Sequence, residues 1–251
     1  MFLNWLAKRL AAYLSKQVAQ HSVPTSTYEA LEKALRPGDV LLVEGDTRIS
    51  VAIKYLTQST WSHAVLYLGP DAGLGMSKDG EPNTLIEADL EVGIRPLPLS
   101  FYRNSHTRIC RPVGLDDDNI NMLAEYALSR LGNQYDLKNV FDLARYLIQT
   151  PPVPSRHRHK LLSLGSGDPT RTICSTFIAE GFQRLRYPIL PTIDTIPSND
   201  PNCRDCIREH YRIRQTSLFT PRDFDASPYF RIIKPTLESD FNFRAIDWAD
   251  L

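Results

Sequence analysis

Short apolar runs bounded by turn residues constrain the fold of this chain more than any other sequence feature. A turn leads into VLLVEG at 40–45, and the runs WSHAVLYLG at 61–69 and TLIEA at 84–88 follow it. Such runs are short for helices and rich in residues that pack a pleated surface. They predict buried strands, together with a weaker strand at 106–113, in a domain that begins at the turn near residue 36.

Other segments place apolar residues three or four positions apart, which is the spacing of an amphipathic helix. Aspartates at 116–118 favour a helix start, because acidic side chains stabilise the positive end of the helix dipole. A proline-rich, basic stretch at 149–170 is the best loop or lid candidate. Beyond Pro188 we expect covering structure with one late strand at 229–235. Helices are predicted at 2–20, 26–35, 49–58, 119–131, 135–149 and 172–187.

Composition narrows the class of protein. With 251 residues, 42% hydrophobic and 23% charged, the chain can form one well-buried domain. Its 29 basic and 29 acidic side chains cancel, so we expect no nucleic-acid partner. Four cysteines are too few for a disulfide scaffold and suit a reducing compartment, which indicates a cytoplasmic protein.

The N-terminal segment at 1–20 has an apolar face, but Lys8 and Arg9 interrupt its apolar run. The run is therefore too short to span a bilayer, and no small-residue cleavage site marks a signal peptide. Two interpretations stay open. The helix lies in a membrane interface as a peripheral contact, to which Phe2 and Trp5 are suited, or it packs against protein.

Three residues have the chemistry of a nucleophilic site. Cys174 begins a predicted helix, where free backbone amides favour the thiolate. His63 opens a predicted strand, and an imidazole has the pKa to take a thiol proton and return it to a leaving amine. Glu87 ends an apolar strand, where a carboxylate needs a partner that His63 can supply. Taken singly, each also fits a structural role: a core thiol, a structural histidine or a solvated charge.

Five blocks in this order resemble the permuted papain-like amidases: GDVLLVEG, SHAVLYLG, LIEA with GIRPLPLSFY, GNQYD and ICSTFIAEGF. These are the YiiX and YaeF type, a circularly permuted branch of the NlpC-type cysteine peptidase superfamily. The resemblance spans roughly 36–190. It implies an α+β papain-like fold, in which a small antiparallel sheet or barrel packs against helices and the nucleophile lies at a helix N-terminus.

Residue by residue, the resemblance implies that Cys174 is the nucleophile, His63 the base and Glu87 the third polar member. Tyr135 of GNQYD matches a tyrosine that lines the site, and its hydroxyl can donate to a developing oxyanion, as can the backbone amide of Cys174. The chain is then expected to be a cysteine amidase or peptidase-like hydrolase, a relative of the thiol proteases. Its partner is a peptide or acyl-amide substrate, and it needs no metal or organic cofactor.

The expected organisation has three parts: an N-terminal helical segment at 1–35, a catalytic domain at 36–190 and a C-terminal covering segment at 191–251. The N-terminal segment replaces the lipoprotein or secretion signal that some relatives carry. The insertion at 149–170 can narrow the cleft, so a cell-wall substrate is less strongly implied.

Two other functions stay open. A lipid-directed thiol esterase or acyltransferase at a membrane surface uses the same acyl-enzyme. The lecithin-retinol acyltransferase-like proteins carry Asn-Cys-Glu-His at the nucleophile, and this chain has Ile-Cys-Ser-Thr at 173–176, which favours hydrolysis. A binding protein on the same fold, with an idle site, is the non-enzymatic alternative.

A second cluster offers metal ligands. Cys203, Cys206 and His210 fall within eight residues, but structural zinc needs four ligands. Reduced loop cysteines are therefore expected, and metal binding stays open. The basic run at 156–160 is read as a solvated loop.

Overall fold

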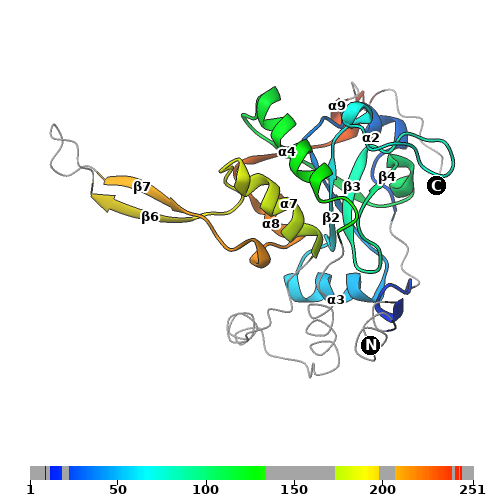
Figure 1. Cartoon of the computed structure of the whole chain (residues 1–251), viewed down its shortest axis with the longest axis horizontal. Coiled ribbons are helices and arrows are strands. Elements are labelled where there is room, and N and C mark those ends of the chain that lie inside the picture. Colours follow the sequence, from blue (N-terminus) through cyan, green and yellow to red (C-terminus); the bar gives the residue numbers. More distant parts are fainter. Residues whose placement is uncertain are drawn as a thin grey trace.

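A six-stranded sheet forms the centre of the fold, in the strand order β4-β3-β2-β1-β5-β8 (Figure 1). The computed structural model describes residues 9, 12–18, 23–133, 173–197, 207–238, 241, 242 and 244. Each pair of neighbouring strands in this sheet is antiparallel. The strands are β1 Val40–Val43, β2 His63–Tyr67, β3 Leu85–Asp89, β4 Gly93–Leu97, β5 Thr107–Pro112 and β8 Phe230–Ile233.

Five of these strands agree with the sequence. The four apolar runs become β1, β2, β3 and β5, and the late strand becomes β8. The sequence does not predict β4, because Arg95 and Pro96 interrupt its apolar pattern. A proline is tolerated there because β4 is the last strand of the sheet and needs backbone partners on one side only.

Helices cover both faces of the sheet. The predictions at 26–35, 49–58, 119–131 and 172–187 are confirmed. Asp116 caps the third of these helices as expected, since its side chain accepts the backbone N–H of Asn119 at 2.8 Å. The helices are α2 Tyr28–Ala34, α3 Arg48–Thr57, α4 Asp117–Ser129, α7 Ile173–Arg184, α8 Pro221–Ala226 and α9 Pro235–Glu238.

The strands alternate between two apolar clusters, one on each face of the sheet. On β1, Val40 and Leu42 belong to a cluster with Phe177 of α7. Leu41 and Val43 belong to the other cluster, which includes residues of α2. Because successive side chains of a strand point to opposite faces, a strand buried on both faces reads as a continuous apolar run. The fold is therefore α+β, as expected, with an antiparallel sheet between helices.

A second, two-stranded sheet stands away from this body (Figure 1). It pairs β6 Thr192–Pro197 with β7 Ile207–Arg212, and every residue of β7 is exposed. These two strands are not predicted from the sequence. The period of two in β7 is visible in the sequence, with Ile207 and Tyr211 on one face and Arg208 and Arg212 on the other.

Several predictions fall outside the described residues. These are the helix at 135–149, the insertion at 149–170, Tyr135, Cys203 and Cys206. Of the predicted helix at 2–20, the described residues 12–14 are helical, and Gln17 forms a β-bridge with Thr47, so this helix ends earlier than expected. In the part of the chain that the structure describes, no helix has the length and apolar character needed to cross a membrane.

Candidate active site

Three of the four predicted site residues lie on elements that meet near one end of the sheet. His63 is the first residue of β2, Glu87 lies in the middle of β3, and Cys174 is the second residue of α7. The described pairing of β2 with β3 covers only Leu66 with Ile86 and the neighbouring pair. Toward His63 the two strands are no longer paired, and α7 packs against both of them.

The two sides of the site come from opposite faces of the sheet. Glu87 lies between Ile86 and Ala88, which belong to the cluster on the α7 face, so its side chain is directed to the other face. Tyr102 belongs to the cluster on that other face. The thiol and the carboxylate therefore reach His63 from different sides, at the point where the strand pairing has ended.

The Glu87 carboxylate is held by three neighbouring side chains. His63 Nε2 lies 2.6 Å from Oε2, and the Tyr102 hydroxyl donates to the same oxygen at 2.5 Å. The other oxygen, Oε1, lies 2.8 Å from Nε and 2.7 Å from Nη2 of Arg95. Only 3% of the Glu87 side chain is exposed. A carboxylate is acceptor-only, so His63 donates its Nε2–H and presents Nδ1 as the nitrogen free to take a thiol proton.

These contacts decide the charge of Glu87 and His63. Burial alone would raise the pKa of Glu87, but the hydrogen bond and charge of His63, with Tyr102 and Arg95, lower it to about 2. Burial alone would lower the pKa of His63. The Cys174 thiolate and the Glu87 carboxylate outweigh that effect and raise the pKa of His63 to about 10. The imidazole is therefore a cation at neutral pH while the thiolate is beside it.

Cys174 is the other half of this ion pair. Its side chain is buried, which opposes ionisation, but the charge and hydrogen bond of His63 lower the pKa of the thiol. The backbone N–H of Ala64 also lowers it, and the Ser175 hydroxyl lies 4.0 Å from the sulfur. The Ala64 amide is available because β2 has separated from β3 at this point. The arrangement stabilises a thiolate at a helix N-terminus.

Cys110 provides an internal comparison. It is a free cysteine of β5 and is as deeply buried as Cys174. Burial raises the pKa of the Cys110 thiol, and the charge of Asp225 adds to this effect. Burial is common to both thiols, so His63 and the Ala64 amide account for the opposite shift at Cys174.

The structure adds Tyr102 and Arg95 to the residues that the sequence singled out. Tyr102 lies in the 3₁₀ turn η2 Leu99–Tyr102, and Arg95 lies on β4 directly opposite Glu87. The cross-strand charge pair of Arg95 with Glu87 becomes visible only with the β3–β4 register, because the sequence does not predict β4. Nothing in the sequence distinguished Tyr102 from a core aromatic. Tyr135 lies outside the described residues, and His210 lies on the exposed strand β7.

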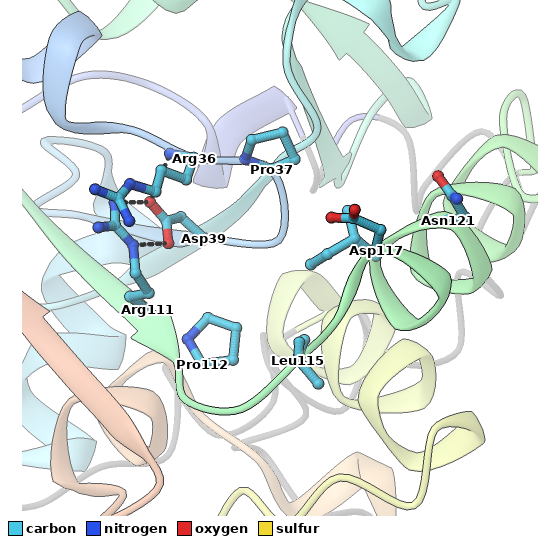
Figure 2. A pocket seen from close by; sticks show the side chains of 9 residues that line it. Arg36, Pro37, Asp39, Arg111, Pro112, Leu115, Asp117 and Asn121 are labelled. Carbon is cyan, nitrogen blue, oxygen red and sulfur yellow. Dashed lines mark hydrogen bonds and ion pairs between the residues drawn. The ribbon is translucent and has the colours of Figure 1, made fainter.

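A pocket of about 720 Å³ lies at the opposite end of β1 from His63 (Figure 2). Asp39 is buried in its wall, where Arg111 contacts both carboxylate oxygens at 2.9 and 2.7 Å and the Arg36 backbone N–H donates at 2.8 Å. Asp117 faces them from the start of α4 (Figure 2). The Asp39–Arg111 ion pair joins the start of β1 to β5, and the pocket is separate from the thiol.

Comparisons with known proteins give likenesses among solved structures. No family model matches the chain, and no curated protein matches it. Among solved structures, the chain is similar to the metalloprotein yiiX from Escherichia coli O157:H7, with a TM-score of 0.45 and 16% sequence identity. The similarity covers 80% of this chain and 97% of that one.

Proposed function

We propose that this protein is a cysteine hydrolase that cleaves an amide bond through an acyl-enzyme on Cys174. One observation carries the proposal: His63 lies between the Cys174 thiol and the buried Glu87 carboxylate, and the thiol has a lowered pKa. A nucleophile, a base and a group that orients the base are the components that acyl transfer to a thiol requires. The substrate class is a peptide or an acylated amine.

The reaction begins when the Cys174 thiolate attacks the amide carbonyl and a C–S bond forms. The negative charge passes to the carbonyl oxygen, where the backbone N–H of Cys174, at the start of α7, is suited to donate a hydrogen bond. The His63 imidazolium then gives its proton to the amine nitrogen, the C–N bond breaks, and the amine leaves.

Water completes the cycle. Neutral His63 takes a proton from the water, whose oxygen attacks the thioester, and the C–S bond breaks to release the acid. The thiolate and the imidazolium are restored as the C–S bond breaks, and the released acid ionises in solvent. Glu87 stays ionised throughout, because its pKa of about 2 lies far below neutral pH. We assign Tyr135 as a further donor to the oxyanion, and this role is part of the proposal.

We place the catalytic domain at 36–190, as expected from the sequence. Cys174, His63 and Glu87 all belong to it, while the segment at 191–251 contributes β8 to the edge of its sheet. A reducing, cytoplasmic compartment suits the proposal, because a reactive thiolate is readily oxidised.

The test is covalent labelling of Cys174 by an activity-based thiol probe and by acyl-amide substrates. Tryptic cleavage after Arg171 and Arg184 gives a peptide whose single cysteine is Cys174, so mass spectrometry assigns the adduct. We expect Cys174→Ala to abolish labelling while the circular dichroism spectrum is unchanged, and Cys110→Ala to retain it. Equal labelling of the wild type and Cys174→Ala would refute the proposal.

A further inference from the structure

The Glu87 carboxylate accepts hydrogen bonds from more donors than are needed to orient the His63 imidazole. Tyr102 and His63 share Oε2, and two nitrogens of Arg95 meet Oε1. A carboxylate offers about four lone-pair sites. All of them have a partner in the protein, so the buried group needs no water to satisfy it.

Full occupancy fixes the direction of the carboxylate as well as its charge. With a single partner, a Glu side chain can rotate about its last bond, which has a broad torsional profile. Arg95 on one oxygen and Tyr102 on the other remove that freedom. The lone pair of Oε2 that remains is the one that His63 occupies.

Arg95 is itself held in place by two further groups. Its Nη2 lies 3.4 Å from Asp89 Oδ2, and its guanidinium lies over the ring of Phe101 at 5.5 Å. Phe101 in turn meets Tyr102 edge-on, with ring centroids 5.1 Å apart. The strand β4 and the turn η2 thus form one support behind the carboxylate.

We propose that Tyr102 and Arg95 are positioning residues, which hold Glu87 so that its carboxylate stabilises the His63 imidazolium and, through it, the Cys174 thiolate. The inference rests on the proposed function, because it assigns these residues to the thiolate–imidazolium pair that the reaction uses. Neither residue acts on the substrate in this proposal. Both act through Glu87.

An experiment on the support of Glu87 must distinguish the effect of one group from the effects of the other charged and titratable groups around this carboxylate. They are His63 from β2, Arg95 from β4, Tyr102 from η2, Asp89 behind Arg95, and Cys174 of α7 beyond His63. Tyr102→Phe changes none of the charges at neutral pH, because burial and the Glu87 charge hold the pKa of Tyr102 well above its usual value. This variant removes one hydroxyl and leaves the ring.

The measurement is the rate of alkylation of Cys174 by iodoacetamide as a function of pH. In the wild type we expect one limb at acidic pH and a flat region above it, because the ion pair is already formed at neutral pH. In Tyr102→Phe, part of the protein returns to the neutral thiol and imidazole. The rate near pH 7 then falls roughly tenfold, the scale of one hydrogen bond to a charged group, and a second rise appears at alkaline pH.

Two matched controls separate positioning from a general loss of structure. Tyr67→Phe removes the hydroxyl of another buried tyrosine in the same apolar cluster. For the arginine, Arg95→Lys keeps the charge but loses the planar fork, and Arg108→Lys makes the same change at another two-point ion pair, with Asp225 at 2.8 and 3.0 Å. We expect Tyr102→Phe and Arg95→Lys to alter the profile in the same direction. Both controls should superimpose on the wild type.

The inference is overturned if Tyr102→Phe and Arg95→Lys both show the wild-type pH profile of Cys174 alkylation. It is also overturned if the controls Tyr67→Phe and Arg108→Lys change that profile equally. If Tyr102→Phe does not fold, Arg95→Lys decides the question. A different result would refute the proposed function: the wild type would show the expected alkylation profile but would form no acyl adduct with any amide. Alkylation thus tests the positioning without a substrate.

Discussion

His63 Nε2 lies 2.6 Å from Glu87 Oε2, although the two residues are 24 positions apart on strands whose described pairing stops before it reaches them. Backbone hydrogen bonds between the strands therefore do not account for this contact. The Glu87 carboxylate is fixed from behind by Arg95 and Tyr102, and His63 projects from the start of β2. The separation of β2 from β3 gives the His63 ring access to both the carboxylate and the thiol.

Replacing His63 should restore an ordinary thiol at position 174. The charge and hydrogen bond of His63 lower the pKa of Cys174 against the effect of burial, so His63→Gln should raise that pKa. We expect labelling at pH 7 to fall roughly 30-fold or more, because an ordinary thiol, with a pKa of about 8.5, is only a few per cent thiolate at that pH. His106→Gln is the matched control, because His106 Nδ1 also contacts a glutamate, Glu44, at 2.9 Å. A similar loss in both variants would contradict the assignment.

Acid should destabilise the protein through Glu87. The pKa of this group falls from 4.5 to about 2 on folding, so the folded state favours the ionised form. Its contribution is complete above pH 4.5 and is lost as the pH falls toward 2, with a total of about 3 kcal/mol. Urea unfolding at pH 6, 4 and 3 should show a smaller decrease for Glu87→Gln than for the wild type. Glu125→Gln, an exposed change on α4, should follow the wild type, and parallel curves for all three proteins would refute the prediction.

Two buried cysteines should differ in reactivity. Iodoacetamide at neutral pH should modify Cys174 in the folded protein and leave Cys110 unmodified, because burial raises the pKa of the Cys110 thiol, whereas His63 lowers that of Cys174. Since the thiolate is the reactive form, the rates should differ by at least about tenfold. Mass spectrometry of the two cysteine peptides measures both rates. In 8 M urea the rates should converge, and rates that are already equal in the folded state would contradict this account.

The structural features that the sequence predicts are those set by residues close together in the chain. Strands buried on both faces appear as apolar runs, and the need of Glu87 for a partner correctly indicated His63. Arg95 escaped notice because β4 has no apolar alternation, although the β3–β4 register places it opposite Glu87. Tyr102 reaches Glu87 from a 3₁₀ turn that is 15 residues away in the chain, and no local pattern encodes such a contact.

The ion pair at the other end of β1 should contribute to stability without affecting the thiol. Asp39 is 1% exposed, and Arg111 contacts both of its carboxylate oxygens. Asp39→Asn leaves the guanidinium without its counter-charge, so we expect a loss of about 3–5 kcal/mol in the free energy of unfolding, measured in urea. The labelling rate of the folded fraction should stay at the wild-type value, because β1 separates this pair from His63. Asp117→Asn, an exposed change across the same pocket, should cost less than about 1 kcal/mol through its lost interaction with the helix dipole and should leave the labelling rate unchanged. A changed pH profile of Cys174 alkylation in Asp39→Asn would show that the two ends of β1 are coupled, and an unchanged free energy of unfolding would show that the ion pair does not stabilise the fold.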